Sequence, residues 1–264
     1  MPFLALDTAT PELTLAIGDE NGRLRAAWSA RAPRMHATLL HPALDELLAD
    51  LGLEPGDIEG VAVGIGPGSY TGVRIGVTAA KTWAFACRVP VAGVSSLAAA
   101  ARAAVAGAGA GASREAVGAA VWDARRGDVY AGAYEARALR GTAAAPPLIA
   151  SARVDGGEFA DRLAALPGVR EGRPVLLCGD AAARVAALLL ERCPGCRCGV
   201  GDERAAVRAE DVLALGLPSL AARLRNRKEG DDEQDAHALV PGYLQLAEAE
   251  ARWRSRQGSD ADGS

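Results

Sequence analysis

Aromatic residues are scarce in this chain: they make up 4% of its 264 residues, although 50% of the residues are hydrophobic. Alanine, valine and leucine must therefore form the core. The 33 acidic residues outnumber the 29 basic ones, which gives a formal net charge of −4. A protein that binds nucleic acid alone usually carries a basic excess, so we expect any RNA contact to be local or supplied by a partner.

Long apolar runs are also missing. No segment reaches the roughly 18 consecutive apolar residues of a membrane span. The first residues, "MPFLALDTAT", have neither the basic start nor the long apolar stretch of a signal peptide. The five cysteines are an odd number without a secretion signal, which indicates reduced thiols. These features predict a cytoplasmic protein that makes no membrane contact.

Residues that bind metals are few. The cysteine cluster "CPGCRC" (193–198) contains three thiols, whereas a structural zinc site usually needs four ligands. Cys178 is the other cysteine in the same half, and it lies inside an apolar strand signal. We favour a simple turn at Pro194 and Gly195 over a metal site. His36 and His41 are five residues apart and diverge on a helix, and the third histidine is His237.

Hydrophobic periodicity predicts the same element order in both halves of the chain, namely three strands, a helix, a strand and a helix. In the first half we expect strands at 3–7, 13–19, 23–29, 60–65 and 89–94, and helices at 35–52, 72–87 and from Ser96. In the second half we expect strands at 116–123, 128–136, 147–154 and 173–180, and helices at 157–166, 181–193 and 209–227. The acidic stretch 228–235 reads as a solvated loop.

This order predicts an α/β protein with mixed sheets and flanking helices. It resembles the duplicated ribonuclease-H-like fold of the actin, sugar-kinase and Hsp70 superfamily. The Gly/Ala breaker at 106–113 separates a lobe at 1–107 from a second lobe at 114–240. Residues 241–264 read as a C-terminal helix and a disordered tail.

The loop "GIGPGSYTGVRIG" (64–76) is rich in glycine, but it matches neither common nucleotide motif. A Walker loop would have a lysine where Val73 stands. The dinucleotide fingerprint, started at Gly64 or Gly66, requires a sixth-position glycine where the chain has Ser69 or Thr71. A general anion site at the N-terminus of the following helix stays open.

Small and apolar residues line one face of each of the helices at 35–52 and 72–87. Gly68, Gly72 and Gly76 are each four residues apart, a spacing that lets another backbone approach closely. The preceding helix has an unusually broad apolar face. Two interpretations are open: both helices only cover their own sheet, or they also dock to another chain.

The segments "GPGSYTGVRIGVTAAKTWAF" (66–85), "LALDTAT" (4–10), "DARRGDVYAG" (123–132) and "PGYLQ" (241–245) closely resemble the bacterial TsaB family, also called YeaZ. The resemblance covers nearly the whole chain. It implies a degenerate relative of TsaD and a non-catalytic role in adding threonylcarbamoyl to N6 of adenosine 37, in tRNAs that read ANN codons. TsaD would be the main partner, the ATPase TsaE would join them, and tRNA would be met indirectly.

The resemblance also implies the loss of a reaction centre. In TsaD a His-Leu-x-x-His metal motif follows the equivalent strand, whereas Ser96 and Ala100 stand at those positions here. Alanine has no donor atom, and a serine hydroxyl is a poor ligand. We therefore expect no catalytic residue, metal or cofactor. The alternative is an enzyme of the same superfamily acting on its own, as a carbamoyl transferase, a kinase or a glycoprotease-like protein.

The nucleotide cradle of the superfamily is only partly preserved. The first turn keeps Asp7, Thr8 and Thr10. The second keeps Asp123, but it has arginines at 125 and 126 where small residues are wanted. Arg125 or Arg126 could pair with an anion. At the expected adenosine pocket Gly179 remains, but Ala181 and Ala182 offer no polar contact.

In the family, the two helices pair with those of TsaD as a four-helix bundle. The resemblance thus implies a partner interface with Arg74 and Lys81 flanking the seam, and the same surface could close a homodimer when TsaD is absent. The interface residues expected are His36, Leu39, Leu40, Ala43, Leu44, Leu47, Gly72, Arg74, Ile75, Gly76, Ala79, Ala80 and Trp83.

Overall fold

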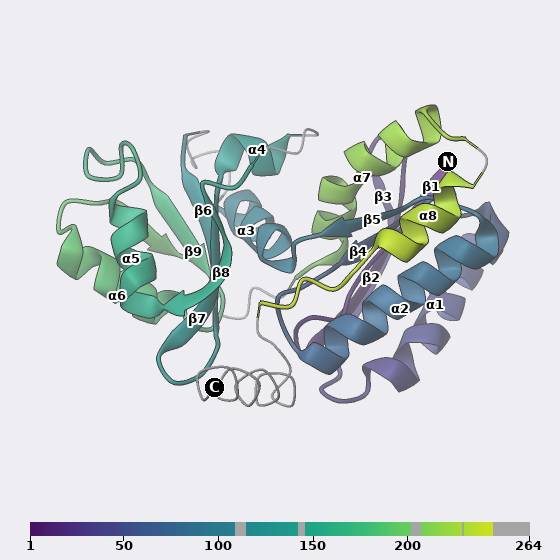
Figure 1. Ribbon diagram of the computed structural model, residues 1–264, viewed down its shortest axis with the longest axis horizontal. Helices are drawn as coiled ribbons and strands as arrows, with labels where there is room; N and C mark the ends of the chain where they lie inside the picture. The colour runs from purple at the N-terminus through teal and green to yellow at the C-terminus, as the bar shows by residue number, and fades with distance from the viewer. Residues whose placement is uncertain (109–114, 142–145, 202–206, 229, 245–264) are drawn as a thin grey trace, which may run out of the picture.

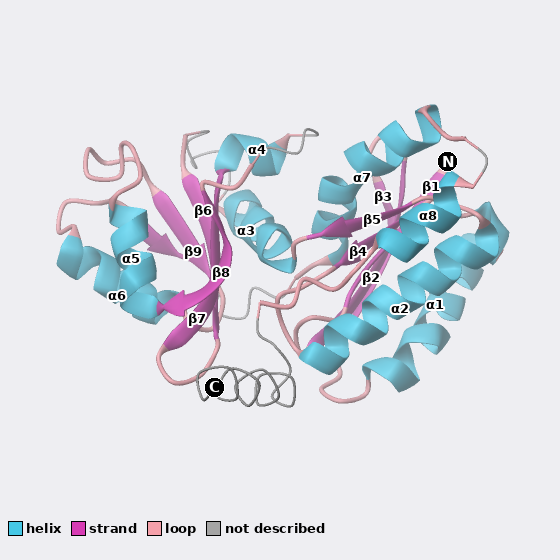
Figure 2. Ribbon diagram, viewed as in Figure 1, coloured by secondary structure: helices cyan, strands magenta, loops and turns pink. Residues whose placement is uncertain are grey.

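The computed structural model describes residues 1–108, 115–141, 146–201, 207–228 and 230–244, which form two lobes, each built on a five-stranded sheet (Figures 1 and 2). The first sheet has the order β3-β2-β1-β4-β5. Its strands are β1 (Pro2–Asp7), β2 (Glu12–Asp19), β3 (Leu24–Arg31), β4 (Val61–Gly64) and β5 (Val91–Val94). The second has the order β10-β9-β6-β7-β8. Its strands are β6 (Val117–Asp123), β7 (Asp128–Glu135), β8 (Ile149–Asp155), β9 (Val175–Cys178) and β10 (Cys198–Val200).

The two sheets have the same topology. In each, the first three strands form an antiparallel meander and the remaining two add in parallel on the other side of the first strand. Parallel neighbours need crossover connections, and helices supply them. This is the duplicated ribonuclease-H-like arrangement, so the predicted fold class is confirmed.

Helices cover both faces of each sheet (Figure 2). On the first sheet, α1 (His36–Leu51) and α2 (Tyr70–Cys87) pack on one face and α7 (Ala209–Arg225) on the other. On the second sheet, α5 (Gly156–Ala164) and α6 (Ala182–Arg192) pack on the outer face, and α3 (Ser96–Gly107) packs on the inner face. The caps are local: Ser69 accepts from the Gly72 N–H at the start of α2, and left-handed Gly52 ends α1.

The lobes exchange helices. α3 follows the first sheet in the chain but packs on β6, β7 and β9, whereas α7 follows the second sheet but packs on β1, β2, β4 and β5. α3 and α7 also contact each other, and one buried apolar cluster runs through both. The predicted second lobe, 114–240, thus includes a helix that belongs with the first sheet. Residues 109–114 and 245–264 of the predicted linker and tail lie outside the described residues.

Four short elements escape the sequence prediction: the 3-10 helix η1 (Pro55–Asp57), α4 (Ala136–Arg140), β10 and α8 (Asp231–Ala238). The prediction of a solvated loop at 228–235 is wrong for most of that range, because α8 begins there and lies along α2 (Figure 1). Arg223 at the end of α7 pairs with Asp235, and Arg227 pairs with Asp232 at 2.7 Å. These basic partners offset the repulsion among the acidic side chains, which is the reason for predicting a solvated loop. Within the described ranges, no helix has both the length and the apolar character needed to cross a lipid bilayer.

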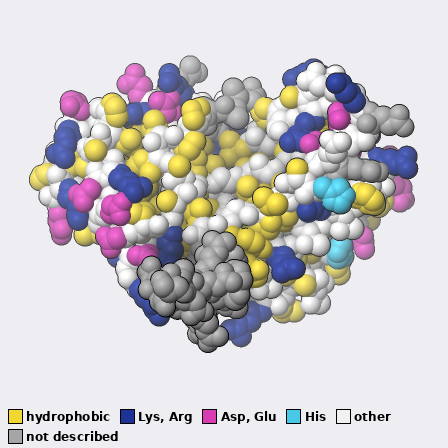
Figure 3. All heavy atoms as spheres, in the orientation of Figure 1, with side chains coloured by type: hydrophobic (Ala, Val, Ile, Leu, Met, Phe, Trp, Pro, Cys, Tyr) yellow, Lys and Arg dark blue, Asp and Glu magenta, His cyan; other side chains and the backbone are white. Residues whose placement is uncertain are grey.

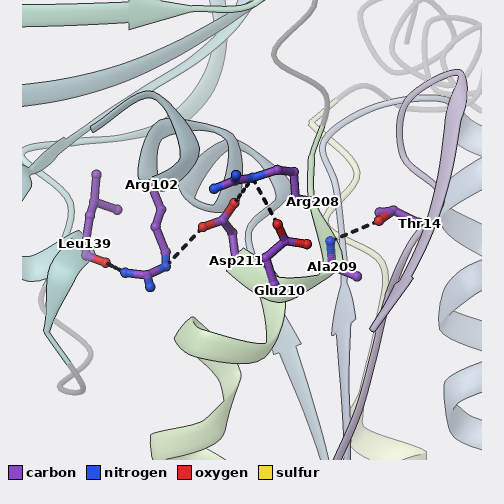
Figure 4. A network of polar contacts seen from close by, with 7 residues as sticks. All are labelled: Thr14, Arg102, Leu139, Arg208, Ala209, Glu210 and Asp211. Atoms are coloured by element: carbon purple, nitrogen blue, oxygen red, sulfur yellow. Dashed lines mark hydrogen bonds and ion pairs between the residues drawn. The ribbon is translucent and has the colours of Figure 1, made fainter. Parts of the chain in front are cut away.

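A buried carboxylate joins the exchanged helices (Figure 4). Asp211 on α7 is 2% exposed; it lies 3.1 Å from Arg102 Nε of α3 and accepts a 2.7 Å hydrogen bond from Arg208 Nε. Arg102 also donates to the carbonyl of Leu139 in the second lobe. Burial raises the pKa of Asp211, and the two guanidinium groups counteract that rise. The network therefore ties α7 to α3 and, through α3, to the second lobe.

Replacing Asp211 by alanine should lower the free energy of unfolding by about 1–3 kcal/mol, because charge-assisted bonds to two part-buried arginines are lost. Urea denaturation measures the loss. The matched control is Arg162→Ala, which removes an exposed pair with Glu158 on α5 and should cost less than about 0.5 kcal/mol. Equal losses in the two variants would contradict a structural role for the network.

Candidate functional site

The glycine loop packs closely against the turn that follows β1, called the first turn below. A Cβ on Gly72 would lie 2.1 Å from the Thr8 carbonyl oxygen, and one on Gly76 would lie 2.3 Å from Thr8 Oγ1. The Thr8 hydroxyl donates to the Gly72 carbonyl at 2.7 Å, and the Ser69 N–H donates to the Ala9 carbonyl at 2.8 Å. The glycine spacing thus serves a close contact between α2 and the end of β1. It needs no foreign backbone to explain it.

Asp7 at the end of β1 is completely buried. Its Oδ1 accepts from the Ala9 N–H at 2.7 Å, and its Oδ2 accepts from the Ser96 hydroxyl at 2.5 Å. Ser96 Oγ in turn accepts from the Gly66 N–H at 3.1 Å. Burial raises the pKa of Asp7 to about 6, and the two hydrogen bonds counteract part of that rise. Asp7 is therefore a buried anchor that links the first turn to the start of α3.

Most of the residues expected at a partner interface lie in the chain's own core. α1 packs on β2 and β3, and α2 packs on β4 and β1, so their broad apolar faces point at the sheet. The buried residues are His36, Leu40, Ala43, Leu44, Leu47, Gly72, Gly76 and Ala80. These side chains contact their own lobe. The apolar face of each helix is broad because the helix packs against both the sheet and the neighbouring helix.

The rest of the expected interface is less buried, although its apolar members still pack at the edge of the first lobe's buried cluster. Ile75, Ala79 and Trp83 are half-buried and recur every four residues on α2, Arg74 is exposed beside them, and Leu39 is half-buried on α1. Such spacing puts the α2 residues on one face. This set, Leu39, Arg74, Ile75, Ala79 and Trp83, is called the α2 outer face below.

Lys81 does not flank that face freely. Its Nζ donates to the carbonyls of His237 at 3.4 Å and Leu239 at 3.1 Å, and so holds the end of α8. Phe85 is 54% exposed and meets the His237 ring edge-on. α8 therefore closes one flank of α2 and leaves the outer face beside it.

A cleft of about 1570 Å³ lies between the lobes, lined by residues that follow β1, β3 and β6 and by the start of α2. Tyr70 and Tyr243 border it with stacked rings 4.6 Å apart. The second turn presents Arg125 and Arg126, both exposed and both in left-handed backbone, with φ of 67° and 57°. Arg34, with φ of 68°, lines the cleft from the first lobe. Left-handed backbone costs a non-glycine residue roughly 1–2 kcal/mol.

Comparison with known proteins identifies the relatives of this chain. The family model of TsaD, tRNA N6-adenosine threonylcarbamoyltransferase, matches residues 30–253. The chain belongs to the TsaD and YeaZ family. A crystal structure of an uncharacterized protein with similarity to peptidase YeaZ, from Pseudomonas aeruginosa, has 31% identity over 92% of this chain and 99% of that chain, with a TM-score of 0.70. YeaZ from the same organism has 29% identity over the same shares and a TM-score of 0.68. No curated protein sequence matches the chain.

At the positions where the resemblance puts the histidines of TsaD, this member of the TsaD and YeaZ family has side chains that serve its own packing. Ser96 bonds to Asp7, and Ala100 is completely buried. Across the described residues, no group of three or more His, Cys, Asp or Glu side chains could hold a metal ion. At "CPGCRC", the Cys196 N–H donates to the Cys193 carbonyl at 3.0 Å, which closes a turn through Pro194 and Gly195.

The cradle of this family member is closed on one side. The Thr8 hydroxyl and the Ala9 carbonyl of the first turn bond to the glycine loop, and a Cβ at Gly68 would lie 2.3 Å from the Ala9 carbonyl oxygen. On the other side, Ala181 and Ala182 are buried and apolar, as the sequence indicates. Two cleft features escaped the sequence prediction, namely Arg34 and the Tyr70–Tyr243 stack. Neither leaves a spacing signal in the sequence.

Gly72→Ala should lower the free energy of unfolding by about 1–3 kcal/mol, because the new methyl meets the backbone of Thr8, which cannot rotate away. The control is Gly107→Ala at the end of α3, where a Cβ has no neighbour within 4 Å and helix propensity favours alanine by up to about 1 kcal/mol. Chemical denaturation of both variants tests the contact. A neutral Gly72→Ala variant would contradict it.

Asp7 should make stability fall as the pH rises. Its pKa is about 6 in the folded chain against 3.8 for an aspartate in water, so the native state binds more protons than the unfolded state between those pH values. The contribution of protonated Asp7 to the free energy of unfolding, on the order of 2–3 kcal/mol, is complete below about pH 4 and is lost by about pH 6. Asp7→Asn should remove this dependence. Unfolding free energies of both proteins across that range measure it, and a constant difference between them would refute the assignment.

Proposed function

We propose that this chain is a non-catalytic subunit of the assembly that adds threonylcarbamoyl to N6 of adenosine 37 in tRNAs that read ANN codons. TsaD is its main partner, the ATPase TsaE joins the pair, and tRNA is the substrate of the assembly. Membership of the TsaD and YeaZ family supports this role.

The observation that carries the proposal is the chemistry at the start of α3. Ser96, at the first expected histidine position, gives its hydroxyl to the buried Asp7 carboxylate, and Ala100 has no donor atom. A metal-dependent transfer needs strong ligands that hold the metal ion and leave at least one coordination position open for the substrate. The side chains here are already satisfied by one another, which supports a partner role rather than turnover.

The α2 outer face is the surface that we assign to TsaD. It offers a row of half-buried apolar side chains at helical spacing with Arg74 at its edge, which suits a second helix laid across it. α8 covers one flank of α2, so the partner approaches on the side of α1. The same face used twice would give a homodimer in the absence of TsaD.

Reconstitution tests the role directly. TsaD, TsaE and this chain are combined with ATP, a source of the threonylcarbamoyl group and an unmodified tRNA transcript, and each subunit is omitted in turn. Modification should need both TsaD and this chain. Turnover by this chain without TsaD would favour the alternative, a self-sufficient enzyme of the superfamily.

Charge on the α2 outer face should break the complex. Ile75→Asp with Ala79→Arg should weaken TsaD binding at least about tenfold, or 1.4 kcal/mol, while circular dichroism shows an intact fold. Leu190→Asp on α6 is the matched control. Leu190 is likewise an apolar helix residue, and it is 43% exposed, but it lies on the other lobe. Calorimetry with purified TsaD measures both. Equal binding by the two variants would place the contact elsewhere.

A further inference from the structure

The cleft carries arginines where its backbone favours glycine. Among the described residues, the non-glycine residues with positive φ are Arg34, Arg88, Arg125 and Arg126. All of these except Arg88 line the cleft. Glycine adopts this conformation without strain, so each arginine carries a local cost that glycine would avoid. Strain of this kind gathers at functional sites, where the side chain is needed.

The guanidinium groups of the three arginines that line the cleft form no ion pair with a described carboxylate. The acidic neighbours have other partners: Glu12 pairs with Arg31 at 3.5 Å, and Asp123 pairs with Arg184 at 3.4 Å. Asp180 accepts from the Asp123 N–H at 2.8 Å. Within the described part of the chain, no carboxylate forms an ion pair with Arg34, Arg125 or Arg126, a set called the cleft arginines below. On the described part of the face in Figure 3, acidic and basic side chains are interspersed over both lobes.

The hydrogen bonding of the first turn and the placement of the arginines favour a chain of phosphates over a single nucleotide. A nucleotide clamp needs free groups on both turns, but the Thr8 hydroxyl and the Ala9 carbonyl of the first turn bond to the glycine loop. Arginines from opposite walls can each contact a separate phosphate instead. Tyr70 and Tyr243, 44% and 40% exposed, border the same cleft and offer ring faces on which a base can stack.

We propose that the cleft arginines bind the phosphodiester backbone of RNA, with Arg34 on one wall and Arg125 and Arg126 on the other. This rests on the proposed function, under which the RNA is the substrate tRNA. The chain would then help to hold tRNA beside TsaD, although its net charge is negative.

The left-handed backbone gives a sharp test, because glycine removes the charge and the strain together. Arg125→Gly with Arg126→Gly should leave the melting temperature unchanged or raise it, yet weaken binding to an unmodified tRNA transcript. The slope of log affinity against log salt should become shallower by about 1.4, at roughly 0.7 per lost phosphate contact. Arg34→Gly should make the same slope shallower by about 0.7. Fluorescence anisotropy across a salt series, on the chain alone and with TsaD, gives these values.

Arg88→Gly is the matched control, because Arg88 has the same backbone conformation, with φ of 53°, at the end of α2 and does not line the cleft. It should leave the salt slope unchanged. An unchanged slope in the Arg125 and Arg126 double variant would overturn the proposal, as would binding of ATP without binding of tRNA. TsaD binding measured in parallel separates the two ideas. If it persists while the cleft variants bind tRNA normally, only the RNA site is refuted.

Discussion

The contact between the start of α2 and the end of β1 determines how the first lobe is built. Gly72 and Gly76 let the helix lie on the backbone of Thr8, and the buried Asp7 ties the same turn to Ser96 at the start of α3. Side chains of any size at these glycines would push α2 off the sheet. Because α3 then crosses to the second sheet, the position of that turn also sets where the second lobe begins.

This contact separates the inside of α2 from the surfaces left for function. Its glycine side is used by β1, and its Lys81 side is used by α8. What remains is the α2 outer face and Tyr70 in the first turn of the helix, which borders the cleft. Ile75 belongs to the α2 outer face and also lines the cleft, so the proposed protein contact and the proposed RNA contact meet on one helix.

The fold was within reach of the sequence, whereas much of the site was not. Strand alternation and helical periodicity report burial directly, so the repeated order of elements and the fold class could be predicted. The same periodicity cannot say what buries a face. Leu40, Leu44 and Gly76 look alike whether they meet their own sheet or a foreign helix, and the structure shows their own lobe. Backbone conformation is equally silent, because a sequence gives Arg125 and Arg126 no sign of a left-handed φ.

The exchanged helices join the two lobes. α3 and α7 hold them together through a shared apolar cluster and the Asp211 network. The positions that the resemblance assigns to metal ligands hold Ser96 and Ala100, and both side chains are completely buried. Ser96 goes further and bonds to Asp7, so a position expected to hold a ligand now supports the turn on which α2 rests.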